Sequence, residues 1–194
     1  MKSPPTIRGL IFDCDGTLAD TMPLHWRAWQ SILSRHGLVL SQERFYSLGG
    51  VPSRDILKLL GREQGIPLDA IAVAREKESA YQPLIAQVEP VNAVVAVARE
   101  HHGRIPMAVA TGGLRRTIDQ VLRHLRIEHL FETVVTSEDV ERQKPAPDIF
   151  LEAARRIGVP PRLCRAYEDT DLGLQAIRAA GMEAWDVREL LRGG

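Results

Sequence analysis

The chain has 194 residues, 44% of them hydrophobic, and its 25 Lys and Arg residues balance its 25 Asp and Glu residues. A chain of this size and composition can bury a core as one domain or as a domain with a sizeable insertion. Zero formal net charge and scattered cations give no electrostatic footprint for nucleic acid or for an anionic membrane. We therefore expect a globular protein with neither partner.

The N-terminal residues, MKSPPTIRG, lack the apolar segment of a signal peptide. No apolar run approaches the roughly eighteen residues that cross a bilayer. We therefore expect a soluble, cytoplasmic protein. Cys14 and Cys164 both lie in or beside apolar strand patterns, which predicts reduced, buried side chains.

Along the chain, two kinds of sequence pattern follow one another. Residues 7–13 form an apolar run typical of a strand buried on both faces of a parallel sheet. From about residue 22 to residue 87 the pattern is helical, with expected helices at 22–37, 51–65 and 68–85. Beyond residue 90, helix and strand patterns alternate. Expected helices cover 91–103, 114–126, 147–158 and 172–181, and expected strands cover 105–111, 131–137, 163–169 and 183–187.

This alternation predicts an α/β fold with a doubly wound, Rossmann-like parallel sheet and right-handed crossovers. The helical block interrupts it after the first strand. We therefore predict a catalytic core domain formed by residues 1–18 and 88–194, and an all-helical inserted domain at 19–87.

Chemically active side chains follow four of the expected strands. They are Asp13 and Asp15 after the first, Thr111 and Gly112 after the second, Lys144 after the third, and Glu168 and Asp169 at the fourth. In an open α/β sheet, ligands bind at the carboxyl ends of the strands. Clustered carboxylates tolerate one another around a hard cation such as Mg²⁺, and Lys144, Thr111 and the amides near Gly112 would balance a phosphate.

The spacing of Asp13 and Asp15 suggests a division of labour. Residues two apart on an extended segment point the same way, so both carboxylates face one centre while Cys14 faces the core. We expect Asp13 to attack phosphorus and form an aspartyl-phosphate. Asp15, with a higher pKa, would protonate the leaving oxygen and later activate water.

Four ordered motifs, DCDGT, ATGG, KPAPD and YEDTDLG, resemble the haloacid dehalogenase superfamily, in the branch of β-phosphoglucomutase and small phosphosugar phosphatases. The resemblance covers nearly the whole chain and implies that the helical insertion is a cap closing over the substrate. It implies Asp13 as nucleophile, Asp15 as general acid/base, Thr111 and Lys144 as phosphate binders, and Mg²⁺ held by Asp13, the Asp15 carbonyl and Asp169, with Glu168 in or next to the shell.

In the cap, His25, Arg54 and Lys77 match positions that face the substrate in this branch, while Gly49 replaces a lysine of the mutase cap loop. The resemblance therefore implies a Mg²⁺-dependent phosphatase for a small phosphorylated metabolite of the fructose-1-phosphate or 6-phosphogluconate type. A sugar phosphate mutase of the β-phosphoglucomutase type is the alternative.

Other interpretations stay open at this point. A phosphoacceptor signalling domain also gathers carboxylates, a Thr and a Lys at a sheet edge, although it needs no helical insertion. A nucleotide-binding module is a further class, but ATGGLRRT lacks the spacing of either glycine-rich fingerprint. Structurally, His25 is equally compatible with packing inside the cap, Arg54 with pairing to Asp55, and Lys77 with a solvated helix face. The sequence does not indicate which oligomeric state the protein adopts.

Overall fold

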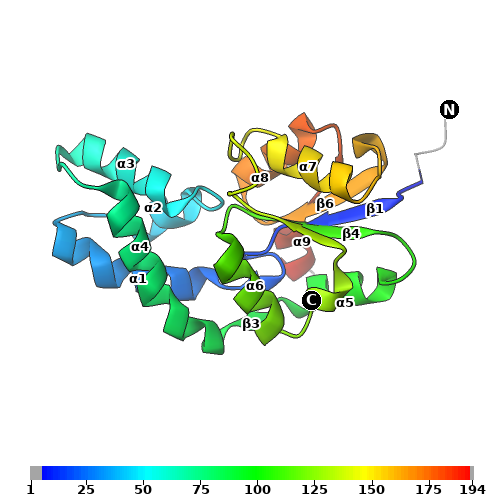
Figure 1. Cartoon of the computed structure of the whole chain (residues 1–194), viewed down its shortest axis with the longest axis horizontal. Helices are drawn as coiled ribbons and strands as arrows, with labels where there is room; N and C mark the ends of the chain where they lie inside the picture. Colours follow the sequence, from blue (N-terminus) through cyan, green and yellow to red (C-terminus); the bar gives the residue numbers. More distant parts are fainter. Residues whose placement is uncertain (1–5, 193–194) are drawn as a thin grey trace.

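The computed structural model describes residues 6–192 of the chain. Its centre is a parallel sheet of five strands in the order β5-β4-β1-β6-β7, with the first strand in the middle (Figure 1). The strands are β1 (Gly9–Phe12), β4 (Met107–Ala110), β5 (Thr133–Val135), β6 (Cys164–Glu168) and β7 (Glu183–Asp186). The predicted doubly wound sheet is confirmed.

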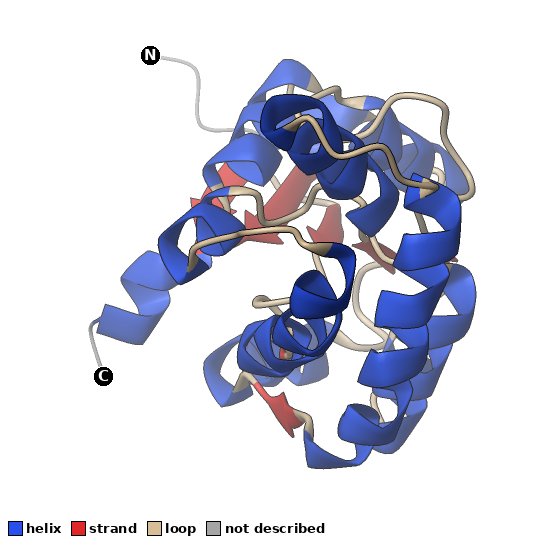
Figure 2. Ribbon diagram, turned by 90° about the vertical axis from the view of Figure 1, so that its left-hand side faces the viewer, coloured by secondary structure: helices blue, strands red, loops and turns tan. Residues whose placement is uncertain are grey.

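Helices cover both faces of this sheet (Figure 2). One face packs against α5 (Asn92–His101), α6 (Arg115–His124) and α9 (Val187–Arg192), and the other against α7 (Asp148–Arg156) and α8 (Asp171–Ala179). Side chains of β1 alternate between the two layers: Leu10 and Phe12 join the first and Ile11 the second. Burial on both faces explains why this strand is apolar throughout.

The inserted segment forms a helical cap beside the core, drawn in blue to green in Figure 1. It contains α1 (Met22–Leu33), α2 (Gln42–Ser47), α3 (Ser53–Gln64) and α4 (Ala70–Tyr81), with short 3₁₀ helices at Ser34–His36 and Gln82–Gln87. Two more short 3₁₀ helices, Glu128–Leu130 and Pro161–Leu163, lie in the core. The cap has its own apolar centre around Trp29, Ile32 and Leu57. The sequence pattern predicted neither α2 nor α9.

The chain leaves and re-enters the core along a small ribbon. Strand β2 (Ala19–Asp20) pairs antiparallel with β3 (Glu89–Pro90), so that Ala19 faces Pro90. The pattern did not predict these strands because two residues carry no periodicity. They lie close to the predicted borders at residues 18 and 88, and they bring the two ends of the cap together.

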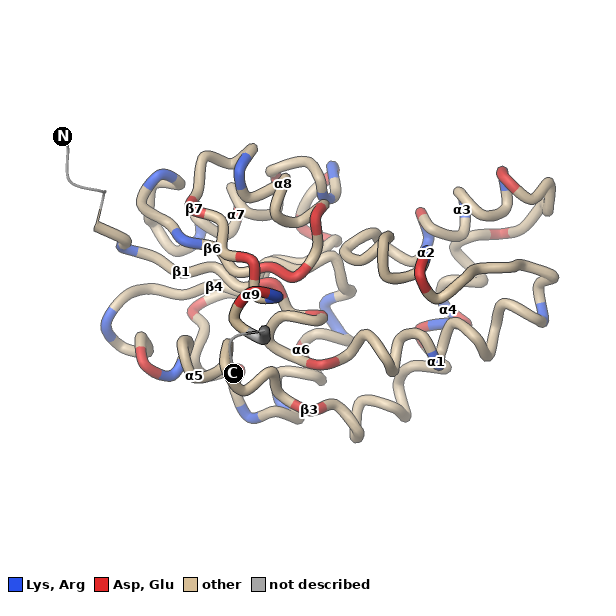
Figure 3. Tube along the Cα trace, turned by 180° about the vertical axis from the view of Figure 1, so that it is seen from behind, with Lys and Arg blue, Asp and Glu red and all other residues tan. Residues whose placement is uncertain are grey.

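The prediction of reduced, buried cysteines is borne out, since Cys14 and Cys164 are both buried free thiols. No helix within residues 6–192 combines the length and apolarity that a membrane crossing requires. Lys and Arg positions are interspersed with Asp and Glu positions along the backbone of both core and cap (Figure 3). The N-terminal stretch MKSPP lies outside the described residues, so its interpretation stays a prediction.

Candidate active site

A buried ion cluster occupies the carboxyl edge of the sheet. Asp13 follows β1, and Glu168 and Asp169 lie at the end of β6. The Lys144 ammonium nitrogen contacts Asp13 Oδ1 and Glu168 Oε2, each at 2.6 Å. Carboxylate oxygens of the three acids lie within 4.8 Å of one another. The structure therefore brings together the acids and the lysine that the strand-end pattern predicted.

One lysine does not neutralise three clustered carboxylates, of which Asp13 and Glu168 are buried and Asp169 is half-buried. Burial and the charge of Glu168 raise the pKa of Asp13 well above its ordinary value, despite Lys144. The same two causes raise the pKa of Asp169 to about 7. An added cation would relieve this repulsion, and an all-oxygen donor set is the kind that Mg²⁺ prefers. The cluster thus has the chemistry of a divalent metal site.

Glu168 is the acid whose oxygens are already engaged. Its Oε2 accepts from Lys144, and its Oε1 accepts from the Asp169 and Thr170 backbone N–H groups and from the Thr170 hydroxyl, at 2.8 to 3.2 Å. Asp169, in contrast, accepts one side-chain hydrogen bond, from Thr17 at 2.9 Å. Asp13 and Asp169 therefore have more lone pairs available for a cation. Glu168 already uses its oxygens to bind Lys144 and the Thr170 turn.

Asp15 belongs to a second polar chain that leads into the cap. It accepts hydrogen bonds from the Thr21 hydroxyl at 2.6 Å and from His25 Nε2 at 3.3 Å. The Lys77 ammonium lies 2.9 Å from His25 Nδ1 and 3.0 Å from Glu78. An ammonium group only donates, so His25 Nδ1 accepts and its Nε2 carries the proton toward Asp15. Burial and the Lys77 charge lower the pKa of His25, in keeping with this neutral ring.

The expectation of a higher pKa for Asp15 is wrong for this arrangement. Burial pushes that pKa upward, but the hydrogen bonds from His25 and Thr21, together with the charge of Lys77, lower it to about 2. The alternative of a solvated Lys77 is also wrong, because its side chain is only 3% exposed. Sequence spacing placed Asp15 correctly, yet its ionisation depends on cap residues that only the fold brings near it.

A cavity of about 740 Å³ separates the cap from the cluster. Eight predicted site residues line it: Asp13, Asp15, His25, Arg54, Lys77, Thr111, Gly112 and Glu168. The remaining two are in contact with this lining: Lys144 donates to Asp13 and Glu168, and the Asp169 backbone N–H donates to Glu168. Exposed Arg54 lines the cavity while its Nε stays 3.7 Å from Asp55, so the pairing and cavity-facing interpretations both describe it.

The cap touches the core at small residues. A Cβ atom on Gly112 would lie 2.6 Å from the carbonyl oxygen of Gly50, and one on Gly49 would lie 2.8 Å from Thr170 Cγ2. Gly50 itself has a positive φ of 82°, a conformation that glycine adopts without strain. The structure therefore shows the cap seated on the turn that follows β4.

The sequence reasoning missed several residues around the site. Thr17 and Thr21 orient Asp169 and Asp15 through their hydroxyls. Tyr81 stacks on His25 with ring centroids 3.8 Å apart, and Glu78 pairs with Lys77. The two threonines stand beside DCDG in the sequence and were detectable as small hydroxyl donors near carboxylates. Tyr81 and Glu78 gave no such signal, since they reach the site only through the packing of α4 on α1.

Comparison with known proteins agrees with this geometry. Residues 10–187 match the model of the haloacid dehalogenase-like hydrolase family. The chain belongs to that family. It is 44% identical to the fructose-1-phosphate phosphatase YqaB of Escherichia coli over 94% of this chain and 97% of that protein. It is 29% identical to a β-phosphoglucomutase of Bacillus subtilis over 92% and 82% of the two chains.

Among solved structures, a β-phosphoglucomutase of Clostridium difficile superposes with a TM-score of 0.85, covering 96% of this chain and 88% of that one at 24% identity. That likeness establishes the shared fold, a parallel sheet with a helical cap. The predicted family resemblance and the predicted enzyme class, a haloacid dehalogenase-like phosphatase, are confirmed.

Proposed function

We propose that this protein is a Mg²⁺-dependent phosphatase that hydrolyses a small sugar phosphate through an aspartyl-phosphate on Asp13. The observation that carries the proposal is the buried Asp13 carboxylate, fixed by Lys144 at 2.6 Å and facing a cavity between core and cap that is large enough for a phosphosugar. The 44% identity to a fructose-1-phosphate phosphatase supports a substrate of that type. A 6-phosphogluconate-type substrate is a second member of the same class.

Asp13, Asp169 and the backbone carbonyl of Asp15 are the groups that would hold Mg²⁺. When bound, the ion neutralises negative charge on the phosphoryl group and on the surrounding carboxylates. This role fits the raised pKa values of Asp13 and Asp169, which record mutual repulsion in a buried setting. Lys144 supplies a further fixed positive charge next to the attacking oxygen.

In the first step, a carboxylate oxygen of Asp13 attacks phosphorus and the bond from phosphorus to the sugar oxygen breaks. The sugar oxygen takes a proton from Asp15 and leaves as a hydroxyl. The negative charge of the arriving phosphoryl group raises the pKa of Asp15 from its low resting value, so that the carboxyl can carry this proton. His25 and Thr21 hold it in place meanwhile.

In the second step, Asp15 removes a proton from water, and the resulting oxygen forms a bond to phosphorus. The bond from phosphorus to Asp13 then breaks and inorganic phosphate leaves. The low pKa of Asp15 in this structure corresponds to the ionised form that accepts this proton. The chain Lys77–His25–Asp15 crosses from cap to core, so closure of the cap supports the working state of the base.

The mutase alternative uses the same first step but must keep water from the phosphoenzyme. The sequence relative with the higher identity is named as a phosphatase, and the β-phosphoglucomutase shares 29%. Gly49, which replaces the mutase cap-loop lysine, also removes a positive charge from the loop that touches Thr170. Both observations support hydrolysis over transfer back to sugar.

A screen of phosphate release from sugar phosphates, with and without Mg²⁺, tests the proposal. The panel includes fructose-1-phosphate, 6-phosphogluconate and β-glucose-1-phosphate, and glucose-6-phosphate is followed as the mutase product. We expect Mg²⁺-dependent phosphate release from at least one small sugar phosphate. Accumulation of glucose-6-phosphate without phosphate release would favour the mutase, and activity with none of the panel would reject both.

A further inference from the structure

The segment that carries Lys144 has no regular secondary structure. Between β5 and α7 the chain runs through turns and bends from residue 136 to residue 147. It nevertheless places the Lys144 nitrogen 2.6 Å from both Asp13 and Glu168. Neither a helix nor a strand fixes this backbone. Turn hydrogen bonds, such as that from the Ala146 N–H to the Gln143 carbonyl at 2.9 Å, and side-chain hydrogen bonds hold it instead.

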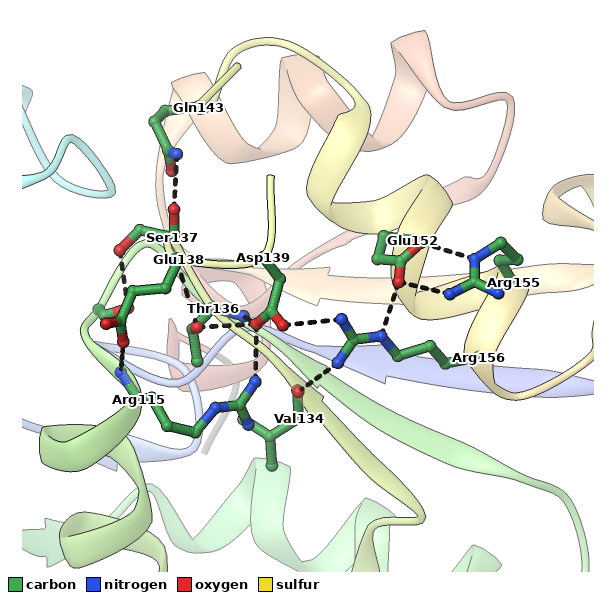
Figure 4. A network of polar contacts seen from close by, with 11 residues as sticks. Arg115, Val134, Thr136, Ser137, Glu138, Asp139, Gln143, Glu152, Arg155 and Arg156 are labelled. Atoms are coloured by element: carbon green, nitrogen blue, oxygen red, sulfur yellow. Dashed lines mark hydrogen bonds and ion pairs between the residues drawn. The ribbon is translucent and has the colours of Figure 1, made fainter. Parts of the chain in front are cut away.

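Asp139 is the centre of those hydrogen bonds. Its Oδ2 accepts from the Thr136 backbone N–H and hydroxyl, both at 2.8 Å, and from the Arg115 guanidinium at 2.6 Å. Its Oδ1 accepts from the Arg156 guanidinium at 2.7 Å (Figure 4). Arg115 begins α6 and Arg156 ends α7. Asp139 thus ties the turn after β5 to helices on opposite faces of the sheet.

Two further side chains connect this turn with the catalytic edge. The Ser137 backbone N–H and hydroxyl donate to the Gly113 carbonyl at 3.2 and 3.1 Å. The Gln143 amide donates to the Ser137 and Val140 carbonyls at 3.1 and 3.2 Å, and Figure 4 shows it spanning the loop toward Ser137. Contacts therefore run without a gap from Asp139 to the residue that immediately precedes Lys144.

These bonds are of the strong kind. Charge-assisted hydrogen bonds are shorter and stronger than neutral ones, and the Asp139 side chain is only 19% exposed. Although burial opposes ionisation, Arg156 and Thr136 hold the pKa of Asp139 well below its ordinary value. Loss of the carboxylate would leave two guanidinium groups and the Thr136 N–H without this acceptor.

We propose that Asp139 is a positioning residue for Lys144. It fixes the turn at residues 136–139, and through Ser137 and Gln143 that turn holds residues 140–144 against the buried acids. Asp139 itself does not line the cavity and touches neither Asp13 nor Glu168. The effect on turnover rests on the proposed function, whereas the effect on the placement of Lys144 does not.

Lysine acetylation of the folded, full-length protein tests this directly. Acetic anhydride is applied to the wild type and to Asp139→Asn, and each lysine is quantified by peptide mass spectrometry. Lys58 is exposed and gives the reference rate, while Lys77 is buried in the cap and makes no contact with the Asp139 turn. We expect acetylation of Lys144 to rise about 10-fold or more and kcat to fall by a similar factor, with Lys77 unchanged.

Two more variants make the result specific. Glu152→Gln removes a charge that Arg155 and Arg156 contact but keeps the Asp139 carboxylate, to which Arg156 also donates, so Lys144 should stay protected and kcat should change less than about twofold. Gln143→Leu cuts the inner connection while keeping Asp139, so Lys144 should again become reactive.

Two outcomes would overturn the proposal: continued protection of Lys144 in both Asp139→Asn and Gln143→Leu, or equal gains at Lys77 and Lys144 in both. The second pattern would reveal general loosening. If the wild type releases no phosphate from any sugar phosphate, the proposed function fails on that result alone. The acetylation pattern still decides whether Asp139 positions Lys144.

Discussion

The core side and the cap side of the cavity are built on different principles. On the core side, Asp13, Lys144 and Glu168 are almost fully buried, and each contacts another at 2.6 Å. On the cap side, Lys77 is buried against His25, but Arg54 is 45% exposed and its Nε lies 3.7 Å from Asp55. The difference indicates that the proposed bond-breaking step uses groups held in fixed positions, whereas Arg54 remains free to adjust to the sugar.

The largest expected effect comes from the core side. Asp13→Asn replaces the carboxylate that is proposed to attack phosphorus with a neutral amide. The value of kcat should therefore fall by about a thousandfold or more. The protein should stay folded, because the amide removes one of three clustered, mutually repelling acids. Phosphate release and a thermal melt on the same sample check both statements. Turnover at the wild-type rate would refute Asp13 as the nucleophile.

Asp15→Asn should act between the two sides. It keeps the shape of the residue but can neither donate nor accept the transferred proton, so kcat should fall by about 10²- to 10⁴-fold. Intact-mass measurement after mixing with substrate should show either phosphate trapped on Asp13 or no phosphoenzyme. His36→Gln, which alters a histidine paired with Glu76 on the cap surface, is the matched control and should behave as wild type.

A smaller effect is expected on the pH dependence of stability when the metal is removed. The pKa of Asp169 in the folded protein is about 7, above its ordinary 3.8. Between these two pH values, the metal-free native state therefore binds more protons than the unfolded state. Its unfolding free energy should therefore fall as pH rises from about 4 to 7. Mg²⁺ replaces the proton, so the rise in Tm on adding Mg²⁺ should be larger at pH 8 than at pH 5. Equal rises at both pH values would argue against carboxylate ligation.

The smallest effect is expected on the cap side. Arg54→Ala removes an exposed cation that lines the cavity, so KM should rise about two- to fivefold with kcat nearly unchanged. Steady-state kinetics on the substrate found in the screen provide the measurement, and Lys58→Ala on the outer face of α3 is the control. A large loss of kcat in Arg54→Ala would break the contrast between the two sides.

The sequence predicted the core side well because its signals are local. Asp13, Thr111 and Glu168 stand at or next to the ends of apolar strands, Lys144 lies in the loop that follows another strand, and parallel strands bring those ends to one edge. Asp13, Thr111, Lys144 and Glu168 therefore fell into place from spacing and order. The alternation also located every strand of the main sheet, and Gly37 and Gly65 marked helix ends in the left-handed conformation.

What escaped prediction depends on contacts between distant segments. The low pKa of Asp15 arises from His25 and Lys77, which approach only when α1 and α4 pack together. Burial of Lys77 has the same origin, since REKE alone is typical of a solvated helix face. The role of Asp139 needs Arg115 and Arg156 from two different helices. Local sequence patterns cannot predict such contacts between residues of different helices.

The β2–β3 ribbon has a consequence for how such enzymes diversify. Since Ala19 and Pro90 are cross-strand partners, the entire insertion begins and ends at points about 5 Å apart. Another helical module with the same end spacing could therefore replace this one without displacing Asp13 or Lys144. Such a replacement would change the residues that contact the substrate, and it would also have to supply partners for Asp15 in place of His25 and Lys77.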